Sequence, residues 1–392
     1  MTYQKSHEIY LDYAATSPMD PKVLSAMTEV LAQEFGNPSS VTHAFGWRAK
    51  AKIDEARASV AECLQAKPEE IIFTSGATES NNLAILGVAH ACKARSQSIV
   101  TLKTEHKATL AAVDHLRQEG YSVRLLGVDA AGRVKMDEFE AALKTSPSLV
   151  SVMMVNNETG VVQDLPVLLE KAKAAGAFFH VDAAQAMGKI PVDLSALPID
   201  LLSISAHKVY GPKGVGALYL RSRPKVPLRP LLFGGSQERS LRPGTLATHQ
   251  IVGLAKALEL ASTSLAQDLA HVNLLSQELL GRLALLPKIQ VNGFAAKRVP
   301  HILNVRFSGV DAEALLASLP QLAVSMGSAC TSGTTEASHV LSAMGLSDEE
   351  ANASLRFSFG RFTALADIRT AADAVVEAVA QLRALSPIWE LA

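Results

Sequence analysis

A lysine stands at the end of a short apolar run that is followed by a turn. The run is apolar at Ile199, Leu201, Leu202 and Ile204, and Gly211-Pro212 predicts the turn. This pattern is typical of a strand buried on both faces, so we expect Lys208 at the end of a rigid element, beside His207. Partial shielding from water disfavours the ammonium form and leaves the amine free to react with a carbonyl carbon. By itself, the stretch also fits a lysine on a surface loop.

Polar side chains follow three other predicted strands, each at the point where the strand ends. The strands and the groups that follow them are 70–74 with Thr78 and the backbone of Ala77, 98–102 with His106, and 177–181 with Asp182 and Gln185. At Thr78 a glycine turn leads into a helix whose first backbone donors could hold a phosphate. No Gly-Lys-Ser/Thr or GxGxxG sequence is present, which removes most support for nucleoside triphosphate or dinucleotide binding.

One cofactor would use all of these side chains if they met at one edge of a sheet. Pyridoxal phosphate needs a lysine for its aldehyde carbon and a carboxylate that keeps its ring nitrogen protonated, so that the ring can accept electrons. Lys208 and Asp182 meet these two needs. The further assignments are His106 for the ring face, Gln185 for the phenolic oxygen, and Thr78, Ser205, His207 and backbone donors around Ala77 for the phosphate.

The elements that must position these residues alternate between strand and helix from residue 70 to residue 220. This order predicts an α/β fold with a mainly parallel sheet covered by helices, in which the carboxyl ends of the strands share one edge. A helix is expected over residues 251–286, with a break near Ser262, and it leads into a smaller α+β lobe. We expect a large domain at 17–260 and a small domain formed by 1–16 and 261–392.

Composition narrows the class of function. The 392 residues exceed the roughly 250 to 300 at which a single core stops growing, which favours two lobes. The net charge of -1 gives no footprint for nucleic acid or an anionic membrane. No long apolar run or signal-peptide core is present, so we expect a cytoplasmic protein. The three cysteines are far apart in the sequence and indicate neither a disulfide framework nor a zinc site.

The chain resembles the cysteine desulfurases of the NifS/IscS type, in the class V aminotransferase family of fold type I pyridoxal phosphate enzymes. The resemblance runs from about residue 9 to about residue 363. It rests on the segments 10–16 (YLDYAAT), 35–40 (FGNPSS), 73–81 (FTSGATESN), 104–108 (TEHKA), 155–160 (VNNETG), 180–185 (HVDAAQ), 205–214 (SAHKVYGPKG), 327–332 (GSACTS) and 356–361 (RFSFGR). It implies a seven-stranded, mainly parallel sheet with helices on its faces and a homodimer.

The resemblance also implies roles for further residues. Asn37, Asn157 and Arg356 would bind the substrate carboxylate, and Asn157 would also contact the cofactor. Thr245 would reach the cofactor phosphate of the neighbouring subunit. Lys208 would move the proton on the substrate Cα, with help from His106.

Cys330 lies among small and hydroxylic residues with glycine at both ends, a composition expected of a mobile loop that carries a thiol. The resemblance implies that Cys330 takes sulfur from L-cysteine as a persulfide, leaves L-alanine, and passes the sulfur to an acceptor such as an iron-sulfur scaffold protein. Thr334-Thr335-Glu336-Ala337 lacks the proline that the family commonly has after this cysteine, and the C-terminus is short, so the acceptor stays open. The alternatives are a selenocysteine lyase, another class V enzyme such as an aminotransferase, and a catalytically silent scaffold.

Overall fold

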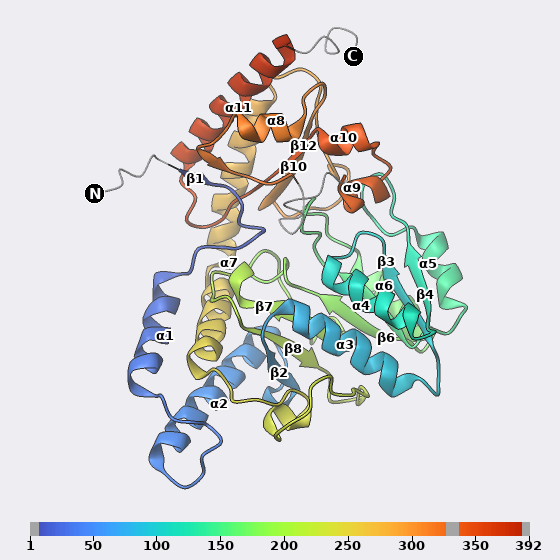
Figure 1. Ribbon diagram of the computed structural model, residues 1–392, viewed down its shortest axis with the longest axis vertical. Coiled ribbons are helices and arrows are strands. Elements are labelled where there is room, and N and C mark those ends of the chain that lie inside the picture. The colour runs from blue at the N-terminus through green and yellow to red at the C-terminus, as the bar shows by residue number, and fades with distance from the viewer. Residues whose placement is uncertain (1–7, 327–336, 386–392) are drawn as a thin grey trace.

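The computed structural model describes residues 8–326 and 337–385. Its largest sheet has seven strands in the order β2-β8-β7-β6-β5-β3-β4 (Figure 1). They are β2 (Ile71–Thr74), β3 (Ser98–Leu102), β4 (Ser122–Leu126), β5 (Leu149–Met153), β6 (Phe178–Asp182), β7 (Leu201–Ser205) and β8 (Gly216–Leu220). Among these seven, β8 alone runs against its neighbours, antiparallel to β2 and to β7. The predicted α/β fold with a mainly parallel sheet is confirmed.

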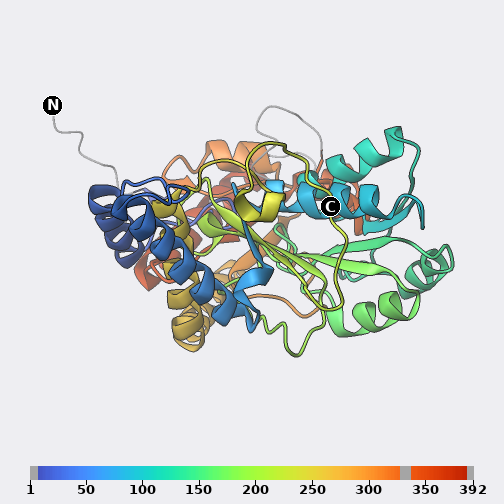
Figure 2. The same cartoon turned by 90° about the horizontal axis from the view of Figure 1, so that it is seen from below.

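The middle strands are apolar on both faces because helices cover both sides of the sheet (Figure 2). Ile99 of β3 packs into one apolar cluster and its neighbour Val100 into another on the opposite side. The helices of this half are α1 (Pro21–Gln33), α2 (Ala44–Leu64), α3 (Ala77–Cys92), α4 (Lys107–Gln118), α5 (Met136–Leu143) and α6 (Leu165–Ala174). Such two-sided cover is what continuous rather than alternating apolar strands require.

Helix α7 (Thr248–Leu283) is continuous, so the predicted break near Ser262 is wrong. Its polar stretch is accommodated within the helix: the hydroxyl of Thr263 donates to the carbonyl of Glu259 (3.0 Å), so this polar group is satisfied without a break. The helix leaves the core of the large sheet after Ala261 and enters a second apolar core at Val272. The domain boundary at residue 260 stays a prediction. The point at which α7 passes from one apolar core to the other lies close to it, between Ala261 and Val272.

The second core contains a three-stranded antiparallel sheet in the order β12-β10-β9, placed above the large sheet in Figure 1. Its strands are β9 (Ile289–Val291), β10 (Ile302–Phe307) and β12 (Ser354–Ser358), and a separate pair is formed by β1 (Ile9–Tyr10) and β11 (Leu322–Ala323). The accompanying helices are α8 (Ala312–Ala317), α9 (His339–Ala343), α10 (Asp348–Asn352) and α11 (Leu365–Leu385). Within the described residues, no helix is long and apolar enough to cross a membrane.

Candidate active site

Lys208 lies directly after a buried strand, as its sequence context predicts. β7 ends at Ser205, and a single turn of 3-10 helix, Ala206–Lys208, follows. The amine Nζ donates hydrogen bonds to the backbone carbonyls of Ala14 (2.7 Å) and Ala15 (2.6 Å). The N-terminal segment therefore holds this half-buried amine at the carboxyl end of β7.

Asp182 is the last residue of β6, beside β7, and its side chain is buried. Oδ2 accepts a hydrogen bond from Nδ2 of Asn81 (2.6 Å), and Oδ1 accepts one from the backbone N–H of Ala184 (2.9 Å). No lysine or arginine among residues 8–326 and 337–385 forms an ion pair with it. A buried carboxylate that has only neutral donors lacks a cation, and a protonated ring nitrogen is the kind of group that would supply one.

His106 is the N-cap of α4, and its imidazole is influenced by the charges of Asp182 and Lys208. Its Nδ1 accepts a hydrogen bond from the backbone N–H of Ala108 (3.1 Å). Burial lowers the pKa of His106; Asp182 raises it again, while Lys208 adds to the lowering. The imidazole is therefore a neutral, flat group held near both Asp182 and Lys208, which suits contact with an aromatic ring.

Two buried amide oxygens at this edge have no hydrogen-bond partner, Oδ1 of Asn81 and Oε1 of Gln185. Nε2 of Gln185 donates to the carbonyl of Ala14 (2.8 Å), which also accepts from Lys208. Buried polar groups are normally paired, so orphaned atoms mark the place of a bound group or of water. Among the described residues, Asp182 likewise lacks a cation. The residues present at this edge therefore fit pyridoxal phosphate.

A second set of residues fits the phosphate of that cofactor. Gly76 precedes α3 with φ of +149°, and no side chain caps the helix at that position. A Cβ on Gly76 would lie 3.7 Å from Oγ of Ser205, and a Cβ on Gly216 would lie 2.7 Å from Cα of Gly76. The strand ends and the helix start therefore approach closely. Because no side chain caps α3, its first backbone N–H groups, at Ala77 and Thr78, are available to an anion.

His207 lies on the same side of Lys208 as the N-terminal segment. Its Nδ1 forms a hydrogen bond with the hydroxyl of Thr16 (3.1 Å). Burial lowers the pKa of His207 to about 4, with the charges of Lys208, Lys213 and Lys189 adding to the effect. The imidazole is therefore neutral and offers a hydrogen bond rather than a charge.

Arg356 extends from β12 toward the same edge and is 1% exposed. Nη1 donates to the backbone carbonyl of Asn157 (3.0 Å), and Nη2 forms an ion pair with Oδ1 of Asp12 (2.8 Å). Nε has no partner. Arg356 and Asn157, two of the three residues that the resemblance assigns to the substrate carboxylate, are thus in contact, and Nε of the guanidinium is still unpaired among the described residues.

Two of the predicted site residues, Asn37 and Thr245, lie on exposed loops. Asn37 is exposed on the loop between α1 and α2, and its side chain bonds only to its own turn, at the N–H of Ser39 (2.9 Å). Thr245 is exposed on the loop that precedes α7. Cys330 lies outside the described residues. The roles of all three stay predictions.

Several contributors to the site were not singled out in the sequence. They are Asn81, Asp12, the carbonyls of Ala14 and Ala15, and the hydroxyl of Thr16. Asn81 could have been found, because an amide four residues after the helix start at Ala77 lies one turn further along the same face. The backbone carbonyls carry no signal in the sequence at all.

Comparison with known proteins shows which family has this sequence and fold. The model of the family described as aminotransferase class-V matches residues 9–370. A curated relative, the cysteine desulfurase IscS of Neisseria meningitidis serogroup C, is 49% identical over 383 residues, which cover 98% of this chain and 95% of the relative. A solved structure named as a NifS-like protein is 34% identical with a TM-score of 0.89, covering 95% of this chain and 100% of that one. The structure titled SspA in complex with cysteine is 35% identical with a TM-score of 0.80, covering 91% and 100%.

The chain belongs to the class-V aminotransferase family, and it is therefore a pyridoxal-phosphate-dependent enzyme. Within that family its relatives are cysteine desulfurases, so the resemblance to the NifS/IscS type is confirmed.

Proposed function

We propose that this chain removes sulfur from L-cysteine, releases L-alanine, and receives the sulfur on Cys330. The observation that carries the proposal is the meeting of Lys208, Asp182 and Arg356 at the carboxyl edge of the large sheet. An amine, a buried carboxylate without a cation and a buried guanidinium are the groups needed by a cofactor and an amino acid together. The relatives named cysteine desulfurase support the choice of L-cysteine.

The residues that would hold the cofactor are those of the sequence prediction. Lys208 would be its covalent attachment point, Asp182 would pair with the ring nitrogen, His106 would contact the ring face and Gln185 the phenolic oxygen. Ala77, Thr78, Ser205 and His207 would hold the phosphate, and Asn157 would contact the cofactor as well as the substrate. When bound, pyridoxal phosphate supplies a ring that accepts the electrons left by the departing Cα proton.

The chain's own residues would then orient the substrate and move protons. Arg356 and Asn157 would fix the carboxylate, because a guanidinium offers several donors in a rigid fork. Nζ of Lys208 would take the proton from the substrate Cα, with the neutral imidazole of His106 nearby. The thiolate of Cys330 would attack the substrate sulfur, so that a sulfur–sulfur bond forms as the carbon–sulfur bond breaks. The electron pair of the broken bond would stay with the carbon part of the substrate, whose Cβ takes up a proton to become the methyl group of L-alanine.

The described residues on either side of Cys330 support its place in this reaction. Ser325 pairs through its backbone with Arg356. On the other side, Ser338 bonds to the carboxylate of Glu158, and Nε2 of His339 to the carbonyl of Glu105 (3.0 Å). These contacts lie next to Asn157 and His106. The chain thus enters and leaves the stretch with Cys330 beside the proposed substrate site.

The other two cysteines are poor candidates for the nucleophile. Burial raises the pKa of the Cys63 thiol to about 11, and burial also raises the pKa of Cys92. A cysteine attacks as its thiolate, so both are held in the unreactive form at neutral pH. This leaves Cys330 as the cysteine that can accept sulfur.

A homodimer is part of the proposal. Exposed apolar side chains lie on two loops and on the first turn of α2, at Phe35, Val41, Phe45, Trp47, Leu232 and Phe233. Nε2 of Gln237 joins the two loops at Oγ of Ser39 (3.5 Å). We call these six residues the apolar patch. Exposed apolar groups of this size mark interaction surfaces. Asn37 and Thr245 lie on the same two loops, which suits residues that would act in the partner's site.

The recipient of the sulfur would be a protein acceptor, such as an iron-sulfur scaffold. A cytoplasmic location stays a prediction from the sequence.

The test is alanine release from L-cysteine, with labelling of persulfide on the protein. Cys330→Ser should lower alanine release at least about tenfold and abolish the persulfide, because a hydroxyl cannot replace the thiolate. Cys63→Ser is the matched control and should keep the wild-type rate. Lys208→Ala should lose the covalently bound cofactor and its yellow colour. Wild-type turnover by Cys330→Ser would refute the assigned role of Cys330.

A further inference from the structure

The N-terminal segment 12–20 contacts three side chains of the proposed site, those of Lys208, His207 and Arg356. Ala14 and Ala15 accept from Lys208, and Thr16 bonds to His207. The hydroxyl of Tyr10 donates to the carbonyls of Asp12 (3.0 Å) and Thr16 (2.8 Å), which closes this turn. The proposed reaction uses none of the side chains of this segment.

Asp12 is the residue of the segment that faces Arg356. Its Oδ1 lies 2.8 Å from Nη2 of the guanidinium, and its side chain is 17% exposed against 1% for Arg356. The segment is tied to β12 at the same level, because the backbone N–H of Tyr13 donates to the carbonyl of Ser358 (3.1 Å). These backbone contacts hold Asp12 in place beside Arg356. The guanidinium of Arg356 is buried, so Asp12 is the charged group that balances it.

The contacts of Arg356 divide its donors into used and unused. Asp12 takes a donor of Nη2 and the carbonyl of Asn157 takes one of Nη1, whereas Nε has no acceptor. Two acceptors from different parts of the chain set the plane of the guanidinium, and a planar fork binds a carboxylate well only in the correct plane. The unpaired Nε is then presented in a defined direction.

We propose that Asp12 is a positioning residue that orients Arg356 for the carboxylate of an α-amino acid substrate. The proposal rests on the proposed function, in which Arg356 binds that carboxylate. Asp12 acts through Arg356 and does not touch the substrate, so it should affect substrates that carry a carboxylate and leave others alone. A residue that merely stabilised the fold would affect both kinds alike.

The experiment compares Asp12→Ala and Asp12→Asn in the holoenzyme. Asp12→Ala removes the acceptor for Nη2 and should raise KM for L-cysteine and the dissociation constant of L-alanine about tenfold, with kcat within about threefold, the loss expected for one charge-assisted hydrogen bond. Asp12→Asn keeps an oxygen in reach of Nη2 and should stay within about threefold of the wild type for both ligands. Binding of L-alanine is followed by the visible absorption of the cofactor.

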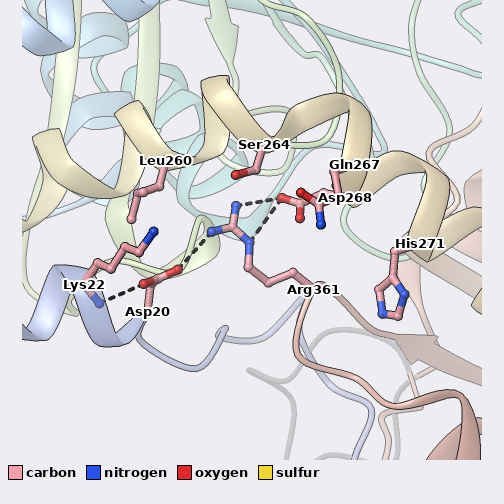
Figure 3. Close-up of a pocket in the computed structure, with 8 residues that line it drawn as sticks. All are labelled: Asp20, Lys22, Leu260, Ser264, Gln267, Asp268, His271 and Arg361. Carbon is pink, nitrogen blue, oxygen red and sulfur yellow. Dashed lines mark hydrogen bonds and ion pairs between the residues drawn. The ribbon is translucent and has the colours of Figure 1, made fainter.

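Cysteamine, which is L-cysteine without its carboxylate, is the comparison ligand, and its inhibition constant should be unchanged in both variants. Asp20→Asn is the matched control, because Asp20 lies in the same segment and also pairs with a partly buried arginine. Figure 3 shows its ion pair with Arg361, which binds Asp268 as well. These residues line a cavity of about 360 Å³. The ratio of L-alanine to cysteamine affinity in this variant should equal that of the wild type. Asp12→Ser replaces Asp12→Ala if the latter does not fold.

An equal loss of L-alanine and cysteamine binding in Asp12→Ala, no loss of either, or tighter binding of L-alanine would overturn the proposal. Two measurements on the wild type, binding of L-alanine and its formation from L-cysteine, test the role of Asp12 and the proposed reaction separately. A wild type that binds L-alanine but makes none from L-cysteine refutes the proposed reaction, and the effect of Asp12 on L-alanine binding can still be measured.

Discussion

Lys189 is a buried lysine that the proposed reaction does not use. It is 6% exposed, and its Nζ donates to the backbone carbonyl of Lys208 at 3.4 Å. No carboxylate of the described residues pairs with it, and the nearby His301 is buried with both ring nitrogens unbonded. Burial lowers the pKa of Lys189 from 10.5 to about 7, and the charge of Lys208 adds to the lowering. The fold therefore buries the amine of Lys189 next to the backbone of Lys208, where its charged form is destabilised.

Lys189→Met should make the stability of the protein less dependent on pH. Between pH 7 and 10.5 the unfolded chain binds the proton of Lys189 and the folded chain does not, so the contribution of this group to stability rises with pH in that window. The variant lacks this slope, so the wild type should gain on it by about 1.4 kcal/mol per pH unit at most. Urea unfolding at pH 7, 8 and 9, followed by circular dichroism, measures the difference.

The exposed Lys144→Met is the control, and its stability should run parallel to that of the wild type. A constant gap between Lys189→Met and the wild type over this pH range would show that Lys189 titrates normally in the folded protein.

Chemically necessary residues were predictable at this scale, and their neighbours were not. Lys208 and Asp182 each follow a recognisable strand, and an amine and a carboxylate in such places have a definite use. Asp12 and Lys189 act through contacts with residues 344 and 19 positions away, in Arg356 and Lys208. No local pattern in the sequence records a pairing of that kind.

At the scale of elements, the close approach of two chain segments shapes the phosphate side of the site. Gly216 begins β8, pairs with Thr74 of β2 and with Ser205 of β7, and lies against Gly76. Strand identity was predictable from apolar runs, such as the one that ends before Lys208 and corresponds to β7. The fit of Gly216 against Gly76 was not predictable, because it depends on the antiparallel placement of β8 between two strands distant in sequence.

Gly216→Ala should displace the start of α3 and weaken cofactor binding. The added Cβ would lie 2.3 Å from the carbonyl oxygen of Ile204 and 2.7 Å from Cα of Gly76, and both are backbone atoms that cannot move aside alone. We expect a loss of about 1–3 kcal/mol in stability and a clear rise in the rate of cofactor release, measured by thermal melting and by dialysis.

Gly281→Ala is the opposite case and the control. A Cβ there meets nothing within 4 Å, and the residue lies in the last turn of α7, so the variant should be more stable by at most about 0.5–1 kcal/mol, with normal cofactor content. If Gly216→Ala retained the cofactor as well as Gly281→Ala does, the close approach at Gly76 would have no bearing on the phosphate site.

At the scale of the whole molecule, one chain assembles most of the proposed site but leaves Asn37 and Thr245 on exposed loops. The large sheet and the lobe of β12 meet through Arg356, Asn157 and the N-terminal segment. The fold class was predictable because strand–helix alternation admits few architectures. The unbroken helix α7, which enters both apolar cores, was not, since a polar Ser-Thr-Ser stretch resembles a helix end.

The apolar patch is where the dimer can be tested. Phe233 is 87% exposed, and a large aromatic side chain so placed is the kind of residue that contributes most to an interface. Phe233→Asp puts a charge into that interface and should shift the protein from dimer to monomer in sedimentation velocity at micromolar concentration. It should also lower the cofactor content, because Thr245 would no longer reach a partner's phosphate.

Leu285→Asp is the control. Leu285 is also a large apolar residue and is 77% exposed, near the end of α7, and this variant should remain dimeric with full cofactor. A wild type that sediments as a monomer, or a dimeric Phe233→Asp variant, would remove the apolar patch as the interface, and Asn37 and Thr245 would then need another explanation.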